Sequence, residues 1–340
     1  MSLRWFLAMI FAFLSPVSTN LADQNVPSPS AVISESAPAP SIPDKARLGA
    51  YIVSVHDLNF SGETFSADFW IWSDYSNPNL QILKTLEFVN AKSTLVNLQN
   101  IQEKEGKVWA QEKVQGVFRH HWDMSNFPFD RHVLSILIEE AQSDVEKLQY
   151  VVDEDNSNFG KDIEIAGFSI QKTTFESKER DYDTNFGDPS APPSSSYTQF
   201  RINLELERVS RILFLKLHAA LYVAFIVTAV CFFIIPQIHK TPQMINAVLS
   251  AMVGSIFATI INLRAADSVI GRSESLTLVD RLHFMTLMYF TLLGLVAIGV
   301  LITRERWTIE QLRYFSHWAA AFYVLSYLVG NVIMVWQAAS

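Results

Sequence analysis

Four apolar segments in the C-terminal part of the chain limit its fold more than any other feature. They cover residues 212–236, 244–263, 281–303 and 314–336. Each is about as long as the roughly 20 residues that an α-helix needs to cross about 30 Å of hydrocarbon. Because unpaired backbone polar groups are costly in lipid, we expect four membrane-spanning helices within residues 211–340.

The chain before these helices carries a different hydrophobic pattern. Apolar side chains occupy every second position of residues 200–206 and of residues 65–71. A period of two is typical of β-strands with one buried face. Many short strands with turn-rich breaks and no long helical pattern favour a β-sandwich in residues 46–210. We therefore predict an all-β domain followed by an all-α membrane domain.

The N-terminus predicts export of this β domain. Residues 1–22 combine a basic residue, a short apolar core and small residues at the end, as in a secretory signal peptide. An uncleaved membrane anchor is the alternative, and it would also export the next segment. Residues 23–45 are rich in Pro, Ser and Ala, which predicts a disordered leader. The single cysteine, Cys231, excludes an intrachain disulfide and a cysteine-based zinc site.

Charge and composition limit the range of possible functions. The chain is 49% apolar with a net charge of −8, which fits one exported part and one membrane part and gives no reason to expect a nucleic-acid partner. If the β domain lies outside, the loops at 239–240 and 304–313 lie inside and carry basic residues, as the positive-inside rule requires. The outer loop 264–281 also holds three arginines, so the agreement with this rule is partial.

The most specific motif lies between two predicted strands. It reads Trp122-Asp123-Met124, then two residues, then Phe127-Pro128-Phe129-Asp130. The motif resembles the signature loop of the pentameric ligand-gated ion channels, the Cys-loop receptor superfamily. Here His120 and Leu134 stand where the animal receptors have cysteines, which resembles the prokaryotic branch.

The resemblance covers about residues 46–336 and implies how such a chain works. It implies an exported immunoglobulin-like sandwich, a four-helix membrane domain and a homopentamer around a central pore. The implied location is a bacterial inner membrane, with several spans in the lipid bilayer and the N-terminal domain in the periplasm. A small-molecule agonist or protons would open the pore to inorganic ions.

The second apolar segment carries a stripe that suits a pore. Its members recur at steps of four and three, so they share one face of a helix. The stripe is polar at the inner end, apolar in the middle and basic at the outer mouth, and a ring of such helices would conduct ions and gate by dewetting. The alternative is that its polar members hydrogen-bond to neighbouring helices. The six residues are Asn246, Ser250, Val253, Phe257, Ile260 and Arg264.

The resemblance also implies which residues couple the sandwich to the pore. Arg208 matches an arginine that joins the two parts in this family, and its expected partner is Asp130, with Asp123 or Glu63 nearby. A buried guanidinium needs such carboxylates. Pro128 is expected to follow a cis peptide bond. The full expected set is Glu63, Asp123, Phe127, Pro128, Phe129, Asp130 and Arg208.

Protons are an alternative agonist, because histidine titrates near neutral pH. His120, His121 and His132 lie close together in the sequence, and Glu63 is expected near them. Each histidine has a purely structural role as its alternative. The acidic run 144–155 has the oxygen ligands that a divalent cation prefers, although a solvated loop is the favoured interpretation.

Six aromatic residues are candidates for the ligand site. Two lie on the predicted strand 64–72, one lies in a segment that resembles the first ligand-site loop of the family, and three flank the predicted capping loop 181–196. An aromatic cage would suit a cationic amine, although packing inside the sandwich is the alternative role of the two tryptophans. The six are Trp70, Trp72, Phe88, Tyr182, Phe186 and Tyr197.

These features predict a ligand-gated ion channel without a cofactor, a metal site or catalytic residues. The sequence has no glycine-rich phosphate loop, nucleophile elbow or HExxH motif. The main alternative is a non-conducting, membrane-anchored periplasmic binding or sensor module, but the short inner loops leave no room for an effector domain. A membrane enzyme is a third alternative, although His283 and His317 lack a second metal ligand at helical spacing.

Overall fold

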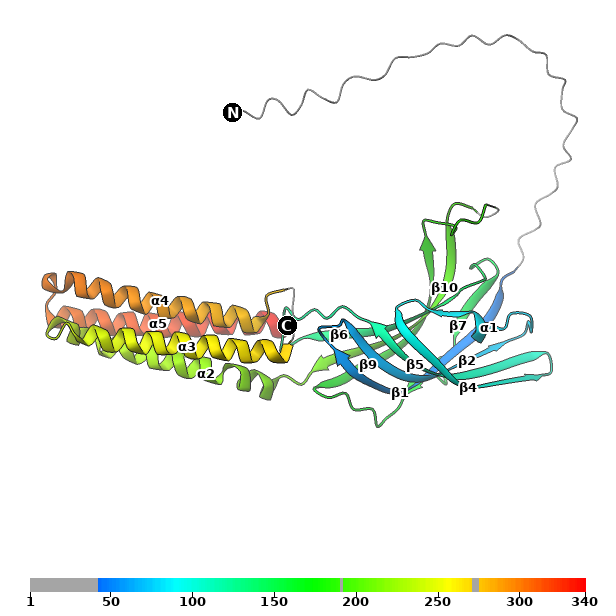
Figure 1. The fold of residues 1–340 in the computed structure, drawn as a ribbon, viewed down its shortest axis with the longest axis horizontal. Coiled ribbons are helices and arrows are strands. Elements are labelled where there is room, and N and C mark those ends of the chain that lie inside the picture. The colour runs from blue at the N-terminus through cyan, green and yellow to red at the C-terminus, as the bar shows by residue number, and fades with distance from the viewer. Residues whose placement is uncertain (1–41, 190–191, 271–274) are drawn as a thin grey trace, which may run out of the picture. The chain divides into compact units, whose positions relative to one another are not determined.

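The structure is a computed structural model that describes residues 42–189, 192–270 and 275–340. The predicted signal peptide (1–22) and nearly all of the predicted leader (23–45) lie outside the described residues. Within the described residues, a β-rich part precedes four long helices (Figure 1). This is the order of domains that the hydrophobic pattern predicts.

The strands form two separate sheets, and each sheet pairs strands that are far apart in the sequence. The first sheet contains β1, β2, β4, β5 and β7, and a short strand, β8, pairs in parallel with β1. The second sheet contains β3, β6, β9 and β10. In spatial order the first sheet is β4 (Ala91–Lys104), β5 (Lys107–Arg119), β2 (Thr64–Tyr75), β1 (Asp44–Asn59) and β7 (Leu148–Val152), with β8 at Asn158–Phe159. The second sheet is β3 (Leu86–Phe88), β6 (Arg131–Glu140), β10 (Ser195–Arg208) and β9 (Phe168–Tyr182). A single helical turn, α1 (Ile82–Thr85), comes immediately before β3 in the chain.

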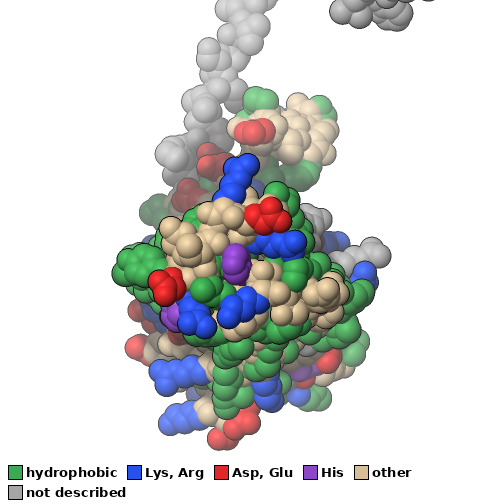
Figure 2. Space-filling model, turned by 90° about the vertical axis from the view of Figure 1, so that its left-hand side faces the viewer, with side chains coloured by type: hydrophobic (Ala, Val, Ile, Leu, Met, Phe, Trp, Pro, Cys, Tyr) green, Lys and Arg blue, Asp and Glu red, His purple; other side chains and the backbone are tan. Residues whose placement is uncertain are grey.

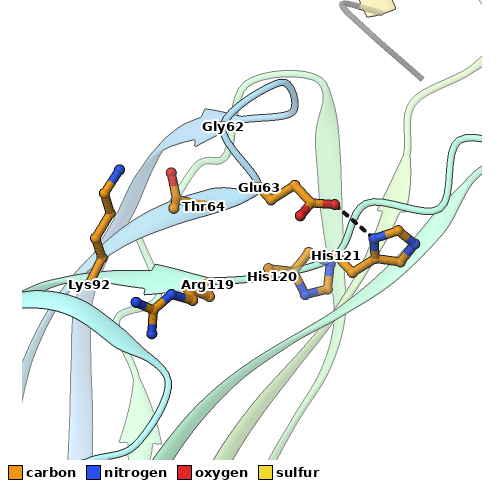
Figure 3. Close-up of a pocket in the computed structure, with 7 residues that line it drawn as sticks. All are labelled: Gly62, Glu63, Thr64, Lys92, Arg119, His120 and His121. Atoms are coloured by element: carbon orange, nitrogen blue, oxygen red, sulfur yellow. Dashed lines mark hydrogen bonds and ion pairs between the residues drawn. The ribbon is translucent and has the colours of Figure 1, made fainter. Parts of the chain in front are cut away.

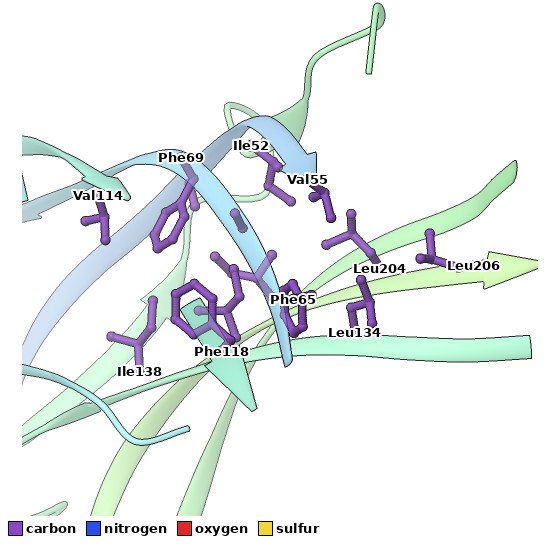
Figure 4. Close-up of a cluster of buried hydrophobic side chains, with 14 of the residues drawn as sticks. Ile52, Val55, Phe65, Phe69, Val114, Phe118, Leu134, Ile138, Leu204 and Leu206 are labelled. Carbon is purple, nitrogen blue, oxygen red and sulfur yellow. The ribbon is translucent and has the colours of Figure 1, made fainter. Parts of the chain in front are cut away.

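The two sheets bury the side chains that alternate in the sequence. Phe65 and Phe69 of β2 are fully buried, and the exposed fraction of Leu204 of β10 is 1%. Figure 4 shows these side chains between the sheets, next to Leu134 and Ile138 of β6. Each such side chain contributes about 1.5–3 kcal/mol when it leaves water. The period-two pattern is therefore confirmed, and the two sheets pack as a β-sandwich.

Four helices long and apolar enough to cross a membrane follow the sandwich. They are α2 (Arg211–Val230), α3 (Met244–Ile270), α4 (Leu278–Thr303) and α5 (Ile309–Ala339). Capping boxes start α4 and α5, because Thr277 and Thr308 each bond to the backbone three residues on and receive the reciprocal bond.

Two helices, α2 and α3, end six and seven residues away from the places predicted for them. The first apolar segment stops being α-helical at Val230 and continues as short 3-10 turns, η1 (Cys231–Phe233) and η2 (Ile235–His239). Pro236 explains the change, because it has no N–H for the helix and its ring clashes with the preceding turn. The second helix runs to Ile270, beyond the apolar segment that ends at residue 263. Hydropathy detects only the part of a helix that suits lipid, whereas the backbone hydrogen bonds of α3 continue through the polar residues that follow.

Apolar contacts join the sandwich to the helices. Leu217 of α2, Ala266 of α3 and Val279 of α4 belong to the same buried cluster as the sandwich core. Phe129 of the signature loop packs on Phe214 of α2, with ring centroids 5.5 Å apart. The base of the sandwich therefore packs directly against three of the helices.

Candidate functional site

Arg208 and Asp130 form a buried ion pair where the sandwich meets α2. Arg208 ends β10, and its side chain is 8% exposed, while that of Asp130 is fully buried. The guanidinium donates from Nε to Oδ1 at 2.7 Å and from Nη2 to Oδ2 at 2.9 Å. This two-pronged geometry is the strongest that arginine makes with a carboxylate. It is also the pairing that the resemblance led us to expect.

Neighbouring aromatic rings and a histidine stabilise the two charges of this ion pair. The Arg208 guanidinium carbon lies 4.3 Å from the ring centroid of Phe168 and 4.9 Å from that of Phe127, so the cation has aromatic faces as well as an anion. His132 donates from Nε2 to Oδ2 of Asp130 at 2.7 Å. Burial favours the neutral acid, but the hydrogen bonds from His132 and Arg208 outweigh it and lower the pKa of Asp130 below its ordinary value.

Two residues expected near Arg208 have other partners. Glu63 accepts a hydrogen bond from His121 at 2.8 Å, and both side chains are largely exposed. Asp123 accepts from the backbone N–H of Ser125 at 2.9 Å. Neither carboxylate makes a hydrogen bond to Arg208, and among the described residues it is His132 that shares Asp130 with the arginine. The signal of His132 in the sequence is the two-residue spacing from Asp130, which precedes β6 by one residue, because residues two apart in an extended chain point to the same side.

The peptide bond between Phe127 and Pro128 is cis, as predicted. It lies in the loop that ends at Asp130. Ser125 of the same loop accepts a hydrogen bond from Arg281 of α4 at 2.7 Å through its carbonyl. The signature loop therefore contacts both α2 and α4.

The predicted histidine cluster lies beside this joint. His120 and His132 have ring centroids 5.7 Å apart, and His121 bonds to Glu63 at the rim of a pocket of about 410 Å³ (Figure 3). Burial, together with the charges of His132 and His121, lowers the pKa of His120 to about 4. His120 is therefore neutral at physiological pH. The other residues that line the pocket are Gly62, Thr64, Lys92 and Arg119.

The six ligand-site candidates do not form one group within a single chain. Tyr182, Phe186 and Tyr197 do cluster, with ring centroids between 5.5 and 6.2 Å apart. Phe88 instead packs on core residues, 6.0 Å from Phe69. Trp70 and Trp72 lie on β2, in the other sheet.

Buried carboxylates accompany these aromatic residues, and sequence reasoning missed their role. Trp72 donates to Asp153 at 2.9 Å, so this member of the acidic run is structural. Tyr182 donates to the buried Glu139 at 2.7 Å, and Gln199 donates to the same carboxylate. Burial and the bond to Glu139 raise the pKa of Tyr182 to about 12. The aromatic cluster therefore rests on a buried, hydrogen-bonded carboxyl group.

The predicted pore stripe lies on the side of α3 that the other helices leave uncovered. Val253 is 45% exposed and Phe257 is 62% exposed, whereas Val248 and Thr259 on the opposite side are fully buried. All six predicted residues are exposed in the single chain: Asn246, Ser250, Val253, Phe257, Ile260 and Arg264.

Asn262 links this helix to its neighbours. Its side-chain amide donates to the backbone carbonyl of Leu217 in α2 at 2.6 Å and to Nε2 of His283 in α4 at 3.0 Å. Nδ1 of His283 bonds to the carbonyl of Val279 at 2.7 Å, which leaves Nε2 as the acceptor. The polar residues of α3 thus divide into a packed group and an exposed group.

Across residues 42–189, 192–270 and 275–340, no cluster of three or more His, Cys, Asp or Glu side chains is arranged to hold a metal ion. The sequence matches no protein-family profile and no curated protein.

Proposed function

We propose that the protein is an ion channel of the pentameric ligand-gated type, in which α3 lines the pore and an event in the exported sandwich opens it. The observation that carries the proposal is the uncovered side of α3. Asn246 and Ser250 on that side are exposed, and polar groups facing hydrocarbon without a partner are costly. This side needs water or protein next to it, and a closed ring of subunits supplies both.

The outermost side of α5 provides a comparison within the same bundle. Phe322, Leu325 and Val332 of α5 are 71%, 65% and 67% exposed, and all three suit lipid. The exposed stripe of α3 instead changes from polar through apolar to basic along its length. Because lipid does not favour that order and a conducting, gated path does, the comparison favours the pore.

The buried joint supplies a route from the sandwich to the pore. Arg208 lies three residues before the start of α2, and its partner Asp130 ends the signature loop that also contacts α4. We propose that a cationic amine at the aromatic cluster, or protonation near the histidines, shifts this joint. The rigid pairing of Arg208 and Asp130 would carry that shift to the helices.

Voltage clamp of the full chain expressed in oocytes tests the proposal. Val253→Ser places a hydroxyl at the apolar part of the stripe, so we expect a standing current without agonist. Val332→Ser on α5 is the matched control and should give no such current. Reversal potentials under chloride and sodium substitution then give the selectivity. If surface-expressed Val253→Ser protein of pentameric mass carries no current, the non-conducting sensor becomes the better interpretation.

A further inference from the structure

The pocket beside the turn between β1 and β2 carries two positive charges that no described carboxylate neutralises. Its volume is about 410 Å³, and Figure 3 shows Lys92 and Arg119 on one side of it, with Glu63 and His121 on the other. Neither cation belongs to an ion pair among the described residues. The side chain of Arg119 makes one long hydrogen bond, at 3.4 Å, to the carbonyl of Ala91. Both cations are therefore available to an anion from outside the chain.

Basic side chains elsewhere on the surface have a different explanation. Figure 2 looks onto the end of the bundle away from the sandwich, where Lys and Arg side chains gather and where Arg306 and Arg313 are exposed. The positive-inside rule accounts for basic residues in the loops that flank membrane helices. It does not account for Lys92 and Arg119, which lie on strands of the sandwich. Their position in one pocket suggests a shared ligand.

Strand pairing places a hydroxyl next to these cations. Thr64, the first residue of β2, lies directly opposite Arg119, the last residue of β5. The side chains of such a pair lie on one face of the sheet, with Cβ atoms about 4.5–5.5 Å apart. Thr64 lines the pocket and is 7% exposed, and its hydroxyl has no hydrogen-bond partner among the described residues. A largely buried hydroxyl without a partner is costly, so this one is suited to donate to a bound group.

A β-bulge brings Lys92 to the same place. Ala91 pairs with Phe118 and Ser93 pairs with Val117, so that Lys92 is the extra residue where the register between β4 and β5 shifts. Bulges re-aim side chains that a regular ladder would point elsewhere. Figure 3 shows this lysine beside the other two donors. Three donors from three strands therefore converge on one side of the pocket.

The opposite wall of the pocket is held in a fixed conformation. The backbone N–H of His120 donates to the carbonyl of Glu63 at 2.9 Å. Glu63 has a φ of 50°, a left-handed conformation that a residue other than glycine keeps only where its surroundings hold it. The ring of His120 packs on Trp122, with centroids 4.5 Å apart. A ligand would thus meet a preformed wall, and binding would not have to order it.

We propose that this pocket binds a small organic carboxylate. The carboxylate accepts hydrogen bonds from the guanidinium of Arg119, the ammonium of Lys92 and the hydroxyl of Thr64. A guanidinium matches the planar carboxylate group with two parallel hydrogen bonds. The volume of about 410 Å³ lies in the range of small-molecule pockets, about 300–1,000 Å³, and leaves room for an organic part.

The carboxylate of Glu63 across the pocket sets the preferred charge of the ligand. It repels a second negative charge, so a monocarboxylate is favoured over phosphate. The site lies within the sandwich and needs no pore, so it is independent of whether the protein conducts ions.

Fluorine NMR of the full chain in detergent micelles tests this site. The probe is para-fluorobenzoate, and the uncharged para-fluorobenzyl alcohol is a control ligand of similar size. We expect saturable binding of the probe and none of the alcohol. Arg119→Gln should weaken binding of the probe by at least about tenfold, as expected for the loss of hydrogen bonds to a charged group, and Thr64→Val by about fivefold. Because Thr64 is buried, Lys92→Gln replaces this second variant if it does not fold, with an expected loss of about tenfold.

Lys113→Gln is the matched control. Lys113 lies on β5, six residues before Arg119 and on the same face of the strand, which places it about 20 Å away. We expect it to leave binding of the probe unchanged. Equal losses in Lys113→Gln and Arg119→Gln, equal binding of the alcohol, or no saturable binding of the probe would overturn the proposal. Displacement of the probe by inorganic phosphate as effectively as by acetate would also overturn it, because the site would then accept any small anion.

Discussion

Arg208 and Arg313, at opposite ends of the helical bundle, lie in contrasting environments. Next to the sandwich, Arg208 is buried and makes two hydrogen bonds to Asp130. At the other end Arg313 is exposed, and the described chain offers it no ion pair. A buried charge must be satisfied within the chain because removing it from water costs several kcal/mol. An exposed charge bears no such cost, so its partner can come from outside. The charge of Arg208 is satisfied within the chain, whereas the charge of Arg313 is exposed at the surface.

The largest effect expected from this difference is that of Arg208→Ala. The substitution leaves the Asp130 carboxylate buried beside His132 alone, so we expect the free energy of unfolding to fall by about 3–5 kcal/mol. We also expect agonist-evoked currents to disappear. Chemical unfolding followed by tryptophan fluorescence measures the first effect, and voltage clamp measures the second.

Arg131→Ala is the control for that experiment. Arg131 follows Asp130 in the chain and pairs at 3.4 Å with Glu207, the neighbour of Arg208, but both side chains of this pair are exposed. Such a pair contributes about 0–1 kcal/mol. Similar losses in Arg131→Ala and Arg208→Ala would remove the distinction between buried and exposed arginines.

The pH dependence of the unfolding free energy tests the effect of burial on another ionisable group at the base of the sandwich, His120. Its folded-state pKa of about 4 lies below the ordinary value of about 6.5, so the unfolded chain takes up a proton first as the pH falls. The stability that neutral His120 contributes is complete above pH of about 6.5 and is lost progressively toward pH of about 4. In His120→Phe we expect the dependence of unfolding free energy on pH to flatten in this window. An unchanged slope would mean that another group near the joint titrates there.

A smaller effect is expected between the two ends, at Asn262. In Asn262→Leu the hydrogen bonds to Leu217 and His283 are lost. Polar contacts between membrane helices contribute about 0.6 kcal/mol on average and up to about 1.7 kcal/mol. We expect a fall of about 1 kcal/mol in the stability of the bundle, measured by thermal unfolding in detergent. Asn246→Leu, on the exposed side of α3, is the control, and an equal fall there would show that the two sides of α3 do not differ.

The smallest effect is expected at the pair of Glu63 and His121. It has the same 2.8 Å spacing as a strong ion pair, but its side chains are 60% and 74% exposed. A double-mutant cycle of Glu63→Gln and His121→Gln should give a coupling energy of at most about 1 kcal/mol. A value of several kcal/mol would mean that exposure is a poor guide to the importance of charges at the base of the sandwich.

The order of the domains and the pairing of Arg208 with Asp130 were both predictable. Alternating side chains in β2 and β10 leave one buried face, and four apolar segments of helical length leave few folds other than a β part followed by helices. The pairing came from the resemblance of the signature loop, since nothing in the spacing of 78 residues between the two partners indicates contact.

Other parts of the site depended on packing that the sequence does not display. Phe88 is an aromatic residue in a segment that resembles a ligand-site loop, but it packs against Phe69 in the core. The strand pattern around Glu139 gives no sign of a special role, yet this residue is buried beneath Tyr182. Which aromatic side chains face a cavity depends on how two sheets meet, and a strand pattern specifies only that alternate residues share a side.

By itself, the sequence determined the two kinds of secondary structure, the four membrane-length helices and which side of α3 differs chemically from the rest. These features are periodic, and periodic patterns follow from local backbone geometry. Tertiary structure alone decided that His132 bonds to Asp130, that Asn262 links three helices and that Glu139 is buried beneath Tyr182. Each of these depends on distances between segments far apart in the chain, and burial, which determines the strength of a charge or hydrogen bond, exists only once those segments have packed.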